Sequence, residues 1–117
     1  ERGHGAPAAF LREHGRRYAA DSVELDAFRA AGGKMILWHG LADAMVPHGK
    51  SAAWYGALTE RFGKRETAAF ARLFMVPGLD HCGVLPDARG LDQFGLDPLG
   101  ALEAWVEGGE APESILR

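Results

Sequence analysis

Two short apolar runs, each followed by a loop with one titratable residue, constrain this chain more than any other feature. Residues 35–38 are continuously apolar, Gly40 breaks the run, and Asp43 follows. Residues 73–76 are also continuously apolar, and His81 follows them after a Pro-Gly turn. Continuous apolar runs are typical of parallel strands buried on both faces. Functional groups in such sheets gather beyond the carboxyl ends of the strands, so the sequence predicts an acid and a base at one edge.

The order of these residues along the chain indicates a particular kind of site. In α/β-hydrolases the catalytic triad occurs in the order Ser, then Asp or Glu, then His, and Asp43 precedes His81. The serines are Ser22, Ser51 and Ser114, and none lies in a G-x-S-x-G elbow. We therefore expect the chain to be the C-terminal portion of a longer hydrolase, with its nucleophile in a preceding segment.

Helical patterns separate and flank the two strands. They predict helices over residues 7–20, 22–31, 49–62 and 98–106, and a long loop over residues 78–96. We expect the charged residues 64–66 to lead into the second strand, and Trp38, Trp54 and Trp105 to pack in the core. The predicted fold class is α/β, a strand-helix-strand-helix portion of a parallel sheet. Residues 1–20 are expected to be a poorly defined segment before a domain over 21–117.

Composition excludes several classes of function. A length of 117 residues, with 47% hydrophobic and 25% charged residues, is typical of one globular domain. A net charge of -3 gives no support for binding to nucleic acid or to an anionic membrane, and no apolar run has the length of a membrane span. Residues 1–20 carry no signal-peptide pattern. The single cysteine, Cys82, is either a free thiol or half of a pair with a partner outside the sequence.

Three segments resemble the tannase and feruloyl esterase family of α/β-hydrolases: residues 32–43 (GGKMILWHGLAD), 72–83 (RLFMVPGLDHCG) and 104–112 (AWVEGGEAP). The resemblance covers residues 22–115 and implies a partial α/β-hydrolase fold. It implies that Asp43 is the catalytic acid and His81 the catalytic base of a two-step ester hydrolysis. It further implies that Cys82 is disulfide-bonded to a cysteine just before the nucleophilic serine.

The resemblance carries further expectations for the complete enzyme. They are an aromatic (phenolic) ester substrate, a secreted or periplasmic location, and calcium in a lid domain that this chain lacks, with no cofactor in the chain itself. The chain departs from the family pattern at two places. Alanine follows Asp43 where the family usually has proline, and Asp80 precedes His81 where the family often has glycine.

Each candidate residue also has a simpler interpretation. His81 could be an exposed loop histidine, and Asp43 could be a turn-forming aspartate, since aspartate caps turns readily. His39 could line a pocket, but a satisfied structural histidine is the more frequent case. A metal site is another interpretation, with His39, Asp43, His48, His81 and Cys82 as its ligands. Their spacings match no dedicated metal motif.

A second class of function stays open from the sequence alone. The chain could be a non-catalytic α/β module that binds a partner, or a second copy of itself, through an exposed sheet edge. Two strands leave unpaired backbone groups along their edges, which other strands can cover.

Overall fold

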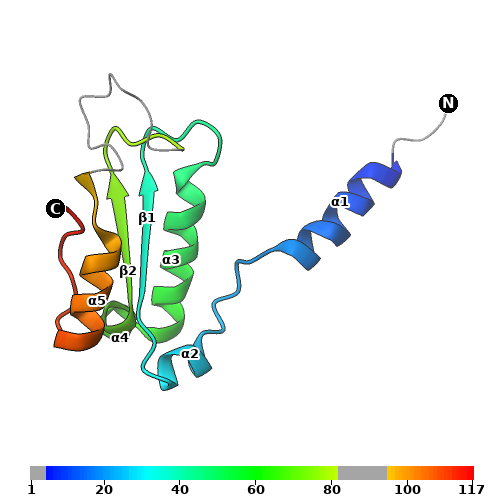
Figure 1. Ribbon diagram of the computed structural model, residues 1–117. Coiled ribbons are helices and arrows are strands. Elements are labelled where there is room, and N and C mark those ends of the chain that lie inside the picture. The colour runs from blue at the N-terminus through cyan, green and yellow to red at the C-terminus, as the bar shows by residue number, and fades with distance from the viewer. Residues whose placement is uncertain (1–4, 82–94) are drawn as a thin grey trace.

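The computed structural model describes residues 5–81 and 95–117, apart from the side chains of residues 5–7 and 16–18. Figure 1 shows a two-stranded sheet with helices on both sides. The elements in chain order are helix α1 (Gly5–Tyr18), helix α2 (Asp26–Ala30), strand β1 (Met35–Gly40), helix α3 (His48–Phe62), helix α4 (Lys64–Phe70), strand β2 (Ala71–Val76) and helix α5 (Pro98–Gly108). None of the described helices is long and apolar enough to cross a membrane.

The two strands are parallel, as the sequence predicts. The register runs from Met35 opposite Ala71 to Gly40 opposite Val76, so both strands end at the same edge. Helices α3 and α5 cover opposite faces of the sheet (Figure 1). Coverage on both faces explains why the strands are continuously apolar rather than alternating.

Two apolar clusters hold these layers together, one on each face of the sheet. On the α3 face the buried residues are Leu58, Phe70 and Ala71, with Met35 and Trp54 among those packed against them. On the α5 face the buried residues are Val76, Leu79, Leu96 and Ile115, with Ile36, Phe74 and Ala101 packed against them. Ile36 and Met35 are adjacent in β1 and point to opposite faces, as the pleat of a strand requires.

Helix α5 begins and ends where local signals predict. The carboxylate of Asp97 caps its first turn by accepting a hydrogen bond from the Gly100 backbone N–H at 3.0 Å, and Pro98 follows. Gly109 ends the helix with a φ of 77°, a left-handed conformation that glycine adopts without strain. Trp105, on this helix, is 2% exposed and confirms its predicted place in the core.

Residues 64–66 differ from the prediction, because they begin helix α4 rather than a plain connection into the strand. Gly63, with a φ of 82°, separates α3 from α4. Thr67 and Phe70 are buried one helical turn apart, and the Thr67 hydroxyl donates to the Leu58 carbonyl at 3.3 Å. Packing of this short face against α3 makes a helix out of a stretch whose charges had indicated a loop.

The prediction that Trp38 packs in the core is wrong for the described chain. Its side chain is 48% exposed. Trp38 lies near the carboxyl end of β1, on the same face as Ile36, but it is not part of the apolar cluster there. No residue of 5–81 or 95–117 covers its outer side enough to bury it.

Helix α1 stands apart from the sheet and the other helices (Figure 1). Phe10 and Leu11 on this helix are 58% and 67% exposed. The helix that the sequence predicts over residues 7–20 is present over residues 5–18, and the Phe10 ring stacks on that of His14 in the same helix, with 3.7 Å between the centroids.

Candidate active site

The loops that follow β1 and β2 meet at the carboxyl edge of the sheet. Backbone bonds join them, from the Leu41 N–H to the Val76 carbonyl at 2.9 Å and from the Ala42 N–H to the Leu79 carbonyl at 3.0 Å. Gly40 is buried where the two loops cross, and a side chain there would collide with the Leu79 carbonyl. Glycine at this position therefore allows the close approach that brings residues 43 and 81 together.

One oxygen of Asp43 organises the loop after β1. Its Oδ1 accepts backbone N–H groups from Met45 at 2.9 Å and from Val46 at 2.8 Å. This is an Asx-type turn, the simpler interpretation that the sequence left open for Asp43. The turn occupies only one carboxylate oxygen, so it does not exclude a second role for the other.

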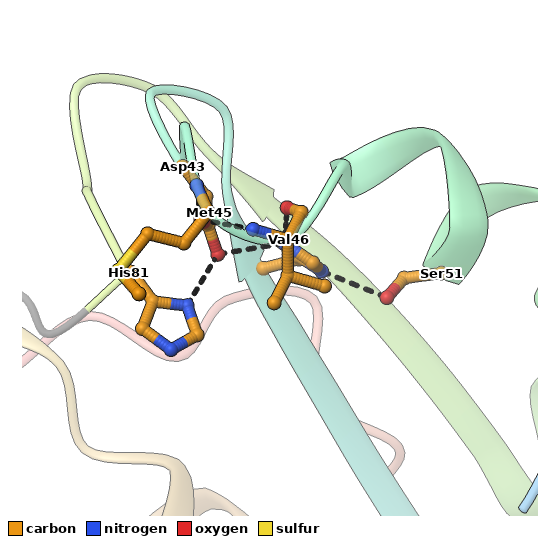
Figure 2. Close-up of polar contacts among 6 residues, drawn as sticks. Asp43, Met45, Val46, Ser51 and His81 are labelled. Atoms are coloured by element: carbon orange, nitrogen blue, oxygen red, sulfur yellow. Dashed lines mark hydrogen bonds and ion pairs between the residues drawn. The ribbon is translucent and has the colours of Figure 1, made fainter.

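The second oxygen of Asp43 faces two histidines. The distance from Oδ2 to His81 Nδ1 is 2.9 Å, and from Oδ2 to His39 Nε2 it is 3.2 Å. Figure 2 shows Asp43 and His81 pointing toward one another from separate loops. The Asp43 side chain is 5% exposed, whereas that of His81 is 40% exposed. The two residues lie together at one edge of the sheet, where the sequence predicts an acid and a base.

The pKa of the Asp43 carboxyl lies well below its ordinary value of 3.8. The largest cause is the hydrogen bond from the Val46 backbone N–H, and the bonds from His81 and the Met45 N–H act in the same direction. Partial burial raises the pKa, but by less than these hydrogen bonds lower it. Asp43 is therefore an anion throughout the neutral range, and the Nδ1 that faces it carries hydrogen.

This low pKa makes the stability of the fold depend on pH in the acid range. Above about pH 5, well above the ordinary pKa of 3.8, Asp43 is ionised in both the folded and the unfolded chain, so its contribution is complete. Below that pH the unfolded chain takes up a proton that the folded chain does not, and the contribution is lost as pH falls. Between about pH 5 and about pH 2, Asp43→Asn should therefore lose less stability than the wild-type chain. Urea unfolding at several pH values measures this, and identical pH dependence in both proteins would contradict the assignment.

His39 and Ser51 extend the network away from His81. The Ser51 Oγ lies 2.8 Å from His39 Nδ1, and the Val46 carbonyl oxygen lies 3.1 Å from His39 Nε2. The sequence favoured a satisfied structural histidine at His39, and the ring does have a partner at each nitrogen. The contact between Ser51 and His39 could not be predicted from the sequence. Only the i, i+4 spacing of His39 and Asp43 could have suggested their contact.

A shallow pocket of about 210 Å³ opens beside the pair. Its lining residues are Trp38, His39, Gly40, Asp43, Val46, Leu79, Asp80 and His81. His48 lies next to this group, with its ring centroid 6.4 Å from that of His39. Cys82, the remaining residue predicted at the site, lies outside the described residues. Within residues 5–81 and 95–117 no group of three or more His, Cys, Asp or Glu side chains is arranged to hold a metal ion.

Known proteins share this arrangement of sequence and fold. The family model described as tannase and feruloyl esterase matches residues 8–116, so the match also includes much of the N-terminal segment that the sequence resemblance had left out. The mono(2-hydroxyethyl) terephthalate hydrolase of Piscinibacter sakaiensis is 48% identical over 100 residues, which are 84% of this chain and 15% of that protein. A probable feruloyl esterase of Arthroderma benhamiae is 37% identical over 93 residues, covering 79% of this chain and 17% of that protein.

A solved structure gives the same result for the fold. The crystal structure of feruloyl esterase B from Aspergillus oryzae superposes with a TM-score of 0.66 at 28% identity, over 80% of this chain and 21% of that one. The chain thus spans 15% to 21% of the length of these three proteins.

Proposed function

This chain belongs to the tannase and feruloyl esterase family, and from that premise we propose that it supplies the acid and the base of a carboxylic-ester hydrolase. Asp43 is the acid, His81 is the base, and the nucleophilic serine lies on a part of the enzyme outside these 117 residues. The observation that carries the proposal is the 2.9 Å contact between Asp43 Oδ2 and His81 Nδ1 at the carboxyl edge of the sheet.

Each nitrogen of His81 has a role in this proposal. With the hydrogen on Nδ1 donated to Asp43, Nε2 has a free lone pair and can accept the proton of the serine hydroxyl as the serine oxygen attacks the ester carbonyl. The resulting imidazolium returns this proton to the departing alcohol oxygen. The acyl group stays on the serine oxygen. Water then attacks this acyl group, and His81 passes a proton from the water to the serine oxygen. This step releases the acid and restores the serine. Asp43 remains ionised throughout and stabilises the imidazolium.

The names of the relatives support an aromatic ester as the substrate. The feruloyl group and terephthalate, which those names contain, both carry an aromatic ring. In this chain the half-exposed indole of Trp38 lines the pocket beside His81. A volume of about 210 Å³ is smaller than pockets that enclose a whole ligand, so we assign the other walls to the rest of the enzyme. We propose a phenolic ester on this basis.

Cys82 fits the same proposal through its position next to His81. A disulfide from Cys82 to a cysteine beside the nucleophile would hold the base loop against the serine. Such a bond persists in oxidising compartments, which agrees with a secreted or periplasmic enzyme.

The open edges of the sheet favour one other function, strand-to-strand association with a partner or a second copy. The described residues form a sheet of two strands. This alternative needs neither the ionised Asp43 nor its contact with His81, so it leaves the site unexplained. Loss of the pair would not affect association, whereas it would abolish ester hydrolysis.

The test of the proposal uses the assembled enzyme, by which we mean these 117 residues in place of the matching segment of the full-length Piscinibacter sakaiensis hydrolase. A fluorophosphonate probe should label one serine of the assembled enzyme and no serine of the 117-residue chain alone. Labelling depends on a serine activated by its base, and the chain has no serine in an elbow. Mass spectrometry of the labelled peptides identifies the site.

Ser51 is the serine of this chain that the probe experiment tests most sharply. It contacts His39, which in turn contacts Asp43, so the three residue types of a triad occur together. Ser51, however, lies inside helix α3 rather than at a strand-to-helix turn. Stoichiometric labelling of Ser51 in the chain alone would overturn the proposed assignment, and Ser51→Ala is the control for the modified peptide.

A further inference from the structure

We propose that His39 is a positioning residue of the esterase site, an imidazole that Ser51 fixes in the Nε2–H form so that it holds Asp43 for His81. This inference rests on the proposed function. It adds a role for two residues, His39 and Ser51, that take no part in the proton transfers described above.

The partners of His39 determine where its hydrogen lies. Nε2 is 3.2 Å from Asp43 Oδ2 and 3.1 Å from the Val46 carbonyl oxygen, and both of these oxygens only accept hydrogen bonds. Nε2 therefore carries hydrogen. Nδ1 is then free to accept the hydroxyl hydrogen of Ser51, whose Oγ lies 2.8 Å away. A ring with hydrogen on Nε2 and a lone pair on Nδ1 satisfies all three partners.

The carboxylate of Asp43 is held from both of its oxygens in this arrangement. Oδ1 accepts two backbone N–H groups of its own loop. Oδ2 accepts His81, which is 40% exposed on a different loop, and His39, which is 12% exposed on β1. The ring of His39 is thus the sheet-anchored donor to the oxygen that His81 uses. Keeping Oδ2 in place when His81 moves between its neutral and charged forms is a positioning role.

The contact between His39 Nε2 and Asp43 predicts different outcomes when His39 is replaced by glutamine and by asparagine. The amide nitrogen of glutamine reaches the place of the histidine Nε2, whereas the amide of asparagine reaches only the place of Nδ1. His39→Gln keeps a donor for Asp43 and should reduce kcat by less than about threefold. His39→Asn keeps a partner for Ser51 but loses that donor, and it should reduce kcat by about 10²-fold with KM nearly unchanged, because a carboxylate displaced by about 1 Å misdirects the base.

Ser51 gives an independent test of the same idea. Ser51→Ala removes the hydroxyl that fixes the tautomer, so part of the population places a lone pair against Oδ2. We expect Ser51→Ala to reduce kcat by about tenfold, and Ser51→Thr, which restores a hydroxyl, to recover most of that loss. If His39→Asn fails to fold, this second pair of variants still decides the question.

The experiment measures kcat, KM and the melting temperature of all four variants in the assembled enzyme. The proposal predicts that glutamine exceeds asparagine and that threonine exceeds alanine in kcat, at similar melting temperatures. Equal kcat for the glutamine and asparagine variants, or a loss only with glutamine, would overturn it. His81→Ala is measured alongside, because an active His81→Ala enzyme would refute the proposed function itself, whatever the result at His39.

Discussion

His81→Ala should lower the kcat of the assembled enzyme by about 10⁴-fold or more, while the melting temperature stays close to that of the parent. The loss is large because, among the described residues that line the pocket, His81 alone has one imidazole nitrogen bound to an aspartate and the other available to accept a proton. The effect on stability is small because the ring is 40% exposed and its described side-chain bond is the one to Asp43. Initial rates with an aromatic ester substrate and a thermal melt give both quantities.

Asp43→Asn should be comparably severe, about 10⁴-fold in kcat. The asparagine amide no longer fixes the hydrogen of His81 on Nδ1, and it cannot stabilise the imidazolium by charge. Asp26→Asn is the matched control. It removes a carboxylate of the same size that pairs with Arg61 at 2.6 Å on an exposed surface, and it should leave kcat unchanged. A near-parental kcat for Asp43→Asn, with a lowered melting temperature, would show that Asp43 acts only as a turn residue.

Leu58→Ala should produce the largest loss of stability among single substitutions in helix α3, about 2–5 kcal/mol in the free energy of unfolding. Leu58 is fully buried against Phe70 and Ala71, between α3 and the elements that follow it. The removed methyl groups leave a cavity that the short helix α4 and the strand can only partly close. Urea unfolding of the chain measures the loss.

Leu99→Ala is the control for this measurement, because it makes the same chemical change at a leucine of α5 that is 64% exposed. Its effect should stay within about 0.5 kcal/mol. Equal losses at the two positions would show that the cluster around Leu58 does not hold the layers together as described.

The sequence predicted those parts of the fold that local signals determine. Continuous apolar runs identified β1 and β2 as buried parallel strands, and Asp97-Pro98 with Gly108-Gly109 identified both ends of α5. Asp43 and His81 each follow one of these strands, and parallel strands end at one edge of the sheet. The closeness of the two residues in space therefore followed from the topology. Their contact could be predicted for that reason alone.

Other features depend on packing between distant segments, and local patterns do not determine them. Helix α4 forms because Thr67 and Phe70 pack on α3, although its first three residues are charged. Trp38 is 48% exposed, although Ile36 and Phe74 beside it pack against the apolar cluster. The hydrogen bond between Ser51 and His39 joins α3 to β1. The irregular loop between them has no sequence pattern from which this contact could be predicted.

If Asp43 acts on catalysis through His81, the two residues will not contribute independently to kcat, and a double-mutant cycle measures this. The kcat of the assembled enzyme is measured for Asp43→Asn, for His81→Ala and for the two changes combined. Residues that act as one unit show strongly non-additive losses. We expect the double variant to be no slower than His81→Ala alone, which would confirm this dependence. Losses that multiply, so that the double variant is slower by the product of the two single effects, would contradict it.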